Sequence, residues 1–160
     1  MEDPDHITVD CRHFGLELSF SLSLSGQKIS SLVFTESPLP TSYNEKNCLH
    51  ASIAGQLLSY LRGDCHHFEL PLLPSGTPFQ QRVWQQLQAI PYGHVLSYGT
   101  LAKQLGTSAR AIGGACRANP IPVIVPCHRV VAANDIGGFA GDRHGGMVSI
   151  KQWLLAHEQN

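Results

Sequence analysis

One stretch in the second half of the chain constrains the fold more than any other. Its apolar spacing predicts a short helix over Tyr98–Leu105, a tight turn at Gly106-Thr107-Ser108 and a second helix from about Ala109 to Ala118. Two short helices joined by a glycine-bearing turn form the helix-turn-helix pattern. Pro120 and Pro122 end the pattern, because proline cannot continue a helix. We therefore expect a helical unit of the type found in DNA-binding proteins.

The second of these helices has an unusual surface. Its two adjacent glycines, Gly113 and Gly114, cost about 2 kcal/mol relative to alanine in a helix interior. Arg110, Gly114 and Arg117 share one helical face, which is therefore basic at both ends and nearly bare between them. Such a face allows a phosphate backbone or the wall of a DNA groove to approach closely. Tight helix–helix packing through glycine and alanine is the alternative that remains open at this point.

The charge distribution divides the chain of 160 residues into two halves. The net charge of −1 by itself argues against nucleic-acid binding, which usually requires a basic excess. Residues 1–75, however, carry four basic and nine acidic residues, a net charge of −5, whereas residues 76–160 carry seven basic and three acidic residues, a net charge of +4. The sign changes at Pro71, Pro74, Ser75 and Gly76, a stretch typical of a linker. We therefore predict one domain over 1–75 and a second over 76–160.

The first half shows the periodicity of a small sheet followed by a helix. Alternating apolar residues between Phe14 and Phe34 predict half-buried strands, with a turn at Ser25-Gly26-Gln27. From Cys48 to Leu61 the spacing becomes helical, and Gly63 is expected to end that helix. The rest of the second half is predicted to hold a helix beginning at Thr77-Pro78, a β-rich segment and a final short helix over Ile150–His157; the β-rich segment covers Ile121–Val131.

A cysteine lies between proline and histidine inside the apolar segment Ile124–Val131. His128 and Arg129 are cations that favour the thiolate form of Cys127 and predict a pKa below the ordinary value of about 8.5. Neighbouring side chains of a strand point to opposite faces, so contact between Cys127 and His128 requires a bend or an intervening water. A buried structural cysteine beside an unrelated histidine is the alternative.

The five cysteines form an odd set without the spacing of a disulfide framework or a standard zinc module. Cys116, Cys127, His128 and His144 match no common zinc site. Two interpretations of the cysteines in the first half remain open. Cys11 and His13 could hold a structural zinc together with Cys65, His66 and His67, or the cysteines are plain core or surface thiols. No run approaches the roughly 18 apolar residues of a membrane span, and the acidic N-terminus lacks the features of a secretory signal. We therefore expect a reducing, intracellular setting.

Taken together, the motifs of the second half resemble the O6-alkylguanine-DNA alkyltransferases. The resemblance covers about residues 78–158 and rests on Tyr98, Arg110–Ala115, Asn119–Pro122, Pro126–Val131 and Trp153–Glu158. It implies an α/β (α+β) fold, with a small N-terminal sheet-plus-helix domain of ribonuclease H-like type and a mainly helical, winged helix-turn-helix-like C-terminal domain. The N-terminal half carries no motif that matches and is only compatible with this family.

The resemblance assigns a role to each residue of the predicted reaction centre. Cys127 corresponds to the thiol that accepts the alkyl group, and His128 to the histidine that draws the thiol proton through a water. Glu158 corresponds to the carboxylate that orients this histidine. Asn119 corresponds to the asparagine that ties the recognition helix to the active-site segment. Tyr98 corresponds to the tyrosine that crowds the target phosphate and protonates the departing guanine.

The same resemblance implies a DNA-binding surface and a substrate pocket. Arg110 corresponds to the arginine that enters the duplex where the target base has left, and the minor groove is the expected contact. The other DNA-binding candidates are Thr107, Ser108, Ala111, Gly113, Gly114 and Arg117, and the pocket candidates are Cys116, Val130, Phe139, Ala140 and Gly141.

Three positions depart from the family pattern. Phe139 stands where tyrosine is common, and Cys116 replaces a larger apolar residue. Asp142-Arg143-His144 forms a short insertion at the pocket rim, which affects the size of alkyl group that the pocket accepts.

The implied function is direct DNA repair by an enzyme that acts once. A methyl or small alkyl group moves from O6 of guanine, with O4 of thymine as a further candidate, to Cys127 after base flipping. The resemblance implies no cofactor and no metal. The expected partner is double-stranded DNA bearing O6-alkylguanine, with no membrane contact, and the expected state is a monomer, with cooperative binding on DNA as an option. The expected location is the cytoplasm, or the nucleus in a eukaryote.

Three other functions compete with this interpretation. A non-catalytic lesion-binding relative would lack the acceptor cysteine, so the presence of Cys127 favours transfer. A helix-turn-helix regulator would present polar, base-reading side chains on its recognition helix, where this chain has glycine and alanine. A cysteine hydrolase would need an oxyanion hole, for which the sequence offers no signal.

Overall fold

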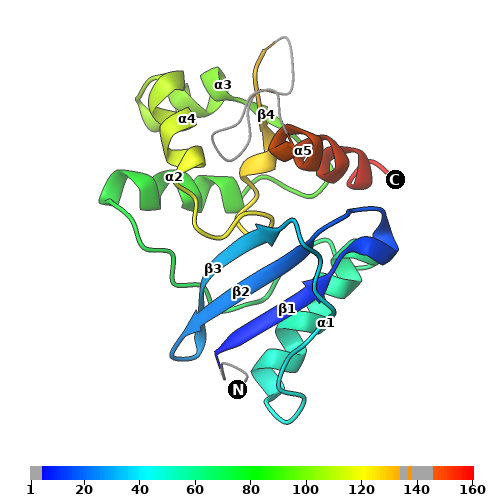
Figure 1. Cartoon of the computed structure of the whole chain (residues 1–160). Coiled ribbons are helices and arrows are strands. Elements are labelled where there is room, and N and C mark those ends of the chain that lie inside the picture. Colours follow the sequence, from blue (N-terminus) through cyan, green and yellow to red (C-terminus); the bar gives the residue numbers. More distant parts are fainter. Residues whose placement is uncertain (1–4, 134–136, 138–145) are drawn as a thin grey trace. The chain divides into compact units, whose positions relative to one another are not determined.

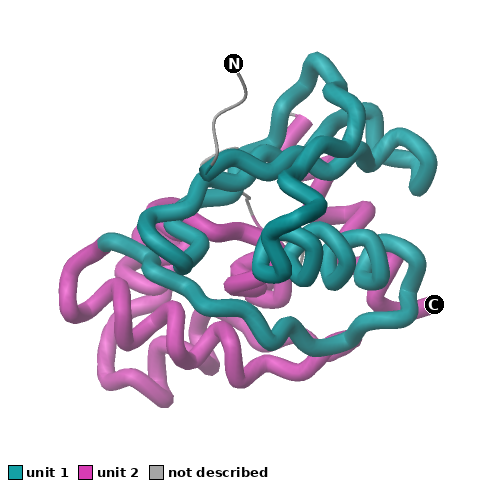
Figure 2. The backbone as a smooth tube through the Cα atoms, turned by 90° about the horizontal axis from the view of Figure 1, so that it is seen from below, with its two compact units in different colours: residues 1–75 teal, residues 76–160 magenta. Residues whose placement is uncertain are grey.

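The computed structural model describes residues 5–133, 137 and 146–160. The chain divides into two compact units, Met1–Ser75 and Gly76–Asn160, shown in different colours in Figure 2. None of the helices in the described ranges is both long enough and apolar enough to cross a bilayer. The mixed fold with a small antiparallel sheet confirms the predicted α/β (α+β) class.

The first unit is an antiparallel sheet of three strands with one long helix (Figure 1). Its strands are β1 (His6–Asp10), β2 (Ser19–Ser25) and β3 (Lys28–Thr35), in the order β1-β2-β3. The predicted turn is confirmed, with Gly26 at φ +63° between β2 and β3. β1 and the short 3-10 turn η1 (Arg12–Phe14) were not predicted, because the expected strand region began only at Phe14.

Helix α1 (Cys48–Arg62) lies beside β1 and completes this unit. The Asn47 side chain accepts hydrogen bonds from the backbone N–H groups of Leu49 at 3.0 Å and His50 at 3.3 Å, which satisfies the free donors at the start of the helix. Gly63 ends the helix in the left-handed conformation at φ +88°, as the sequence predicts. The core of the unit is built from all three strands and one face of α1; it includes Ile7, Phe20, Leu32, Ile53 and Leu57.

The second unit is mainly helical. It contains α2 (Pro78–Gln88), α3 (Tyr98–Leu105), α4 (Ala109–Arg117) and α5 (Gly146–His157). Two short strands, β4 (Leu96–Ser97) and β5 (Val130–Val131), pair in parallel. Thr77 and Gln80 form a reciprocal capping box at the start of α2, and Pro78 occupies the first turn.

The predicted β-rich segment Ile121–Val131 is wrong over most of its length. The backbone N–H of Val125 donates to the Ile121 carbonyl at 2.9 Å, and Cys127–Arg129 form a single 3-10 turn, η2. Only Val130–Val131 are a strand. Prolines within the segment lack the N–H that a strand ladder needs. Val123 has φ +72°, a conformation that costs a β-branched residue about 1–3 kcal/mol and interrupts any strand.

Candidate functional site

The outer face of α4 is bare between two arginines. Arg110, Gly114 and Arg117 are all exposed, as is Ala109 at the start of the helix. A Cβ atom added at Gly113 or Gly114 would meet no described atom within 4 Å. The glycines therefore do not serve close helix packing, and that alternative interpretation of the sequence is wrong.

The opposite face of α4 is fixed against α2. Trp84 Nε1 donates a hydrogen bond to the Ala115 carbonyl at 2.9 Å, and Trp84 itself is buried. The preceding turn is equally well defined, because Gly106 adopts φ +66° and Ser108 Oγ accepts from the Ala111 N–H at 3.1 Å. Thr107 lies half-buried within that turn. A rigid helix pair thus presents the bare face to solvent.

Asn119 joins the end of α4 to the segment that carries Cys127. Its Nδ2 donates to the Val125 carbonyl at 2.8 Å, and its Oδ1 accepts from the Ile121 N–H at 3.0 Å. These two hydrogen bonds from the Asn119 side chain hold the loop between Asn119 and Val125 in a closed conformation. Cys127 follows directly, and its backbone N–H donates to the Val125 carbonyl at 2.8 Å.

The two residues after Cys127 both bind one carboxylate. His128 Nε2 lies 2.7 Å from Glu158 Oε2, and Arg129 reaches the same carboxylate with Nε at 2.8 Å and Nη2 at 3.0 Å. All three side chains are buried. Arg129 Nη1 also donates to the Ile90 carbonyl at 2.7 Å, and its guanidinium lies over the Tyr92 ring. α5 therefore fixes the η2 turn through Glu158, the residue that follows its last turn.

His128 is poised as a neutral base. Burial lowers the pKa of His128 below its ordinary value, although the hydrogen bond and charge of Glu158 act in the opposite direction. Because Glu158 accepts from Nε2, the imidazole proton belongs on that nitrogen and Nδ1 carries the free lone pair. Nδ1 is buried and has no hydrogen-bond partner among the described residues.

The predicted lowering of the Cys127 pKa is wrong for this structure. Burial raises the pKa of the thiol to about 11, against smaller lowering effects from hydrogen bonding by Asn119 and from the charge of Lys151. The sequence suggested His128 and Arg129 as the cations that act on the thiol, but both side chains are engaged by Glu158. Among the described residues, the cation whose charge lowers the pKa of Cys127 is Lys151, which lies far away in the sequence.

Lys151 is the buried residue that sequence reasoning missed. It lies on α5 with no exposed surface, and its Nζ donates to the Val130 carbonyl at 2.7 Å. The Nζ also lies 5.7 Å from the centroid of the Tyr98 ring. The signal was present in the sequence, because Lys151, Leu154 and Glu158 recur at helical spacing on one buried face.

The predicted pocket residues are only partly placed. Val130 is fully buried in β5, and Cys116 is buried on α4, where burial raises the pKa of its thiol. Tyr98 is half-buried at the start of α3, and a Cβ at Gly137 would lie 2.9 Å from its ring. Phe139, Ala140 and Gly141 lie outside the described residues, as does the insertion Asp142-Arg143-His144.

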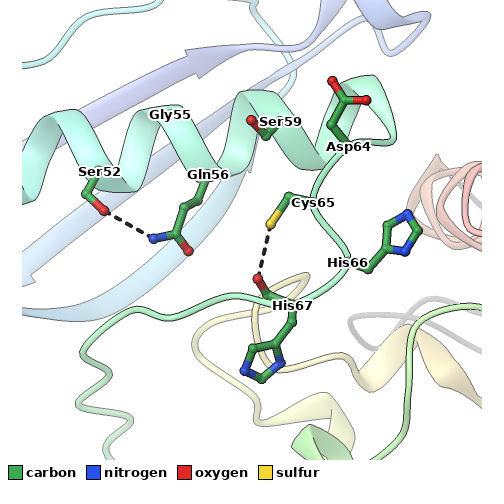
Figure 3. Close-up of a pocket in the computed structure, with 8 residues that line it drawn as sticks. All are labelled: Ser52, Gly55, Gln56, Ser59, Asp64, Cys65, His66 and His67. Carbon is green, nitrogen blue, oxygen red and sulfur yellow. Dashed lines mark hydrogen bonds between the residues drawn. The ribbon is translucent and has the colours of Figure 1, made fainter.

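The residues considered for zinc in the first unit do not converge. Cys65, His66 and His67 line an open pocket beside α1, but their side chains point in different directions in Figure 3. The Cys65 thiol donates to the His67 carbonyl at 3.1 Å, and Cys11 is buried with its Sγ 3.6 Å from the Val9 carbonyl. Within the part of the chain that the structure describes, no three His, Cys, Asp or Glu side chains are close enough to hold a metal ion.

Comparison with known proteins identifies the family. Residues 78–160 match the model of the 6-O-methylguanine DNA methyltransferase DNA-binding domain. The chain belongs to this family. The match covers the whole helical unit apart from its first two residues, and it confirms the resemblance seen in the sequence.

Individual members of the family are similar beyond that domain. A methylated-DNA--protein-cysteine methyltransferase of Mycolicibacterium paratuberculosis is 42% identical over 127 residues, which cover 78% of this chain and 74% of the relative. The crystal structure of Mycobacterium tuberculosis O6-methylguanine methyltransferase has a TM-score of 0.77 at 34% identity and covers 96% of this chain and 92% of that one. A structure of the Mycobacterium tuberculosis protein in complex with DNA has a TM-score of 0.70 at 34% identity, with 88% and 86% of the two chains covered.

Proposed function

We propose that this chain repairs DNA directly, by transferring a methyl or small alkyl group from O6 of guanine to Sγ of Cys127. The observation that carries the proposal is the arrangement around the acceptor. Cys127 is buried, and the next residue, His128, is held by Glu158 with its Nδ1 available to accept a proton. Membership of the methyltransferase family supports the same reaction.

The proposed reaction moves one alkyl group and one proton. The thiol proton of Cys127 passes through a water to Nδ1 of His128, whose neutral state follows from burial. The thiolate then attacks the alkyl carbon, the S–C bond forms, and the C–O6 bond breaks with its electron pair staying on guanine. Guanine takes a proton from the Tyr98 hydroxyl, and the proton held on His128 then passes through water to the Tyr98 phenolate, so that both side chains are neutral again. The thioether is stable, so each molecule acts once.

The proposed DNA contact is the exposed face of α4. Without side chains at Gly113 and Gly114, the helix backbone can approach the minor groove, and Arg117 stands at the C-terminal end of the face to meet phosphates. The target base must leave the stack to reach a buried thiol, and Arg110 is long enough to fill the space that it vacates. Thr107, Ser108 and Ala111 extend this surface along the turn and the first helical turn.

We propose that one protein molecule acts on one lesion in double-stranded DNA. We propose a monomer as the working unit, with cooperative binding along DNA as a separate property to be measured. The protein would act where the DNA is, in the cytoplasm of a bacterium or in the nucleus of a eukaryote.

A mass measurement tests the reaction. The protein is incubated with a duplex oligonucleotide containing O6-methylguanine, and the intact mass is measured. We expect wild type and the control variant Cys48→Ser, which changes an exposed thiol, to gain one methyl group each. Cys127→Ser should gain none. A wild type that stays unmodified, or a Cys127→Ser variant that is methylated, would refute the proposal.

A further inference from the structure

The end of α4 leaves one buried carbonyl group to be satisfied from outside the helix. The last four carbonyl groups of a helix have no N–H partner within it. At this end the Ala118 N–H donates to the Gly114 carbonyl at 3.1 Å. The next N–H, of Asn119, donates to the Cys116 carbonyl at 3.2 Å, whereas in a longer helix it would serve Ala115. Because Ala115 is buried, its carbonyl needs another donor.

Trp84 of α2 supplies that donor. Its indole Nε1 donates to the Ala115 carbonyl at 2.9 Å in a buried hydrogen bond, and only 1% of Trp84 is exposed. Gly76, just before α2, lies against the indole ring. A Cβ atom added at Gly76 would overlap Cη2 of the ring and would lie 2.7 Å from its Cζ3. The position of the indole is therefore defined from both sides, by the missing side chain at position 76 and by the carbonyl of α4.

The helical turn that Trp84 holds carries part of the bare face of α4. Gly114 and Arg117 are exposed in this last turn, whereas Ala115 between them is buried and bonded to α2. α4 has nine residues and contains two glycines, and a helix shorter than about 12 residues is marginal without tertiary contacts. Without the hydrogen bond at Ala115 we expect the turn to fray, so that DNA would have to order it on binding.

We propose that Trp84 is a positioning residue for DNA recognition, whose indole N–H holds the last turn of α4 in the conformation that the duplex contacts. The proposal rests on the proposed function, because it takes the bare face of α4 as the DNA-binding surface. Trp84 acts through Ala115 rather than on the acceptor. The loop that leads to Cys127 is held separately, by the side chain of Asn119. The expected effect is therefore on affinity for DNA and not on the transfer step.

Two variants perturb this contact in different ways. Trp84→Phe keeps a buried aromatic ring but removes the N–H donor. Gly76→Ala keeps the donor and displaces the ring instead. Tyr60→Phe, which removes a polar group from a buried aromatic ring of the first unit, is the control for the first variant. Gly55→Ala on α1, where an added Cβ meets no described atom within 4 Å, is the control for the second. Circular dichroism and thermal unfolding show which variants are folded.

The first readout is the Kd for an undamaged duplex, measured by fluorescence anisotropy. A hydrogen bond typically contributes a factor of about five, equal to about 1 kcal/mol, so Trp84→Phe should raise the Kd about fivefold. Gly76→Ala should also raise it, but by less when added to Trp84→Phe, since both changes act on one contact. Tyr60→Phe and Gly55→Ala should bind as wild type does. An unchanged Kd for Trp84→Phe, or fully additive effects of the two changes, would overturn the proposal.

The second readout separates positioning from a general role in core packing. The single-turnover rate of transfer is measured over a range of concentrations of an O6-methylguanine duplex. Trp84→Phe should need about fivefold more duplex to reach half of its maximal rate, and that maximal rate should equal the wild-type value, because only binding is weakened. A maximal rate that falls as much as the affinity does would contradict a positioning role.

Failure of this proposal can be told apart from failure of the transfer function. If wild type accepts no methyl group while Trp84→Phe weakens duplex binding, the transfer function fails and the role of Trp84 is retained. If wild type accepts a methyl group while Trp84→Phe binds and reacts as wild type does, the role of Trp84 fails alone.

Discussion

In a Glu158→Gln variant, the buried carboxylate between His128 and Arg129 becomes a neutral amide of nearly the same shape. The carboxylate accepts hydrogen bonds from His128 Nε2 and from Nε and Nη2 of Arg129, and only 1% of the Glu158 side chain is exposed. Removing one partner of a buried ion pair costs about 3–5 kcal/mol, because the remaining charge is left without compensation. Arg129 keeps its hydrogen bond to the Ile90 carbonyl, so we expect a loss of about 3 kcal/mol in the free energy of unfolding.

Urea denaturation at neutral pH measures this loss in the second unit, and thermal unfolding gives an independent value. For a domain of this size, a loss of 3 kcal/mol corresponds to a fall in Tm of about 12 °C or more. Glu36→Gln, an exposed carboxylate on the chain after β3, is the control and should stay within about 0.5 kcal/mol of wild type.

The double variant Glu158→Gln/Arg129→Met tests whether the loss of stability comes from the uncompensated charge of Arg129. Because methionine removes the uncompensated guanidinium, this variant should be more stable than Glu158→Gln alone by about 1 kcal/mol or more. The electrostatic explanation is refuted if Glu158→Gln costs less than about 1 kcal/mol, or if the added Arg129→Met change lowers stability further.

Three further predictions concern the DNA surface and the histidine. Arg110→Ala should slow transfer from a duplex about tenfold or more but leave transfer from free O6-methylguanine unchanged, and equal slowing in both single-turnover assays would exclude a flipping role. Gly114→Leu should stabilise α4 by about 1 kcal/mol, since an added Cβ meets no described atom within 4 Å, while weakening duplex binding measured by fluorescence anisotropy; unchanged affinity would show that DNA binds elsewhere. Burial lowers the pKa of His128, so the unfolded chain takes up its proton first and the free energy of unfolding should fall as pH drops below about 6.5, by up to about 1.4 kcal/mol per pH unit. His128→Gln should flatten this acid limb, and a limb that stays equally steep would assign the effect to another group.

The helix-turn-helix could be predicted because its signals are local. The glycine at position 106 and the capping serine at 108 define the turn by their own backbone preferences, and both helices lie where the sequence places them. The segment before Cys127 could not be predicted in the same way. Its apolar residues are typical of a strand, but prolines and the side-chain hydrogen bonds of Asn119 close it into a loop.

The pKa values of the site were harder to predict from the sequence, because they depend on residues that are distant in the sequence. Neighbours in the sequence suggested that His128 and Arg129 act on Cys127, whereas both bind Glu158, about thirty residues later. Lys151 is likewise distant in the sequence, and its charge acts on the pKa of the thiol only because α5 buries it with its Nζ at the Val130 carbonyl. A pattern of residues can indicate which groups belong to a site, but the sign of a pKa change requires knowing their burial.

The high pKa of the buried acceptor has a consequence for a protein that is used only once. Burial raises the pKa of Cys127 to about 11, so a smaller fraction of this thiol is ionised at pH 7 than of an ordinary cysteine. Peroxides and small electrophiles in a cell react with thiolates, and they must also reach a residue that is only 5% exposed. We therefore expect burial to protect the acceptor thiol of the resting protein from reaction with other electrophiles before a damaged base arrives.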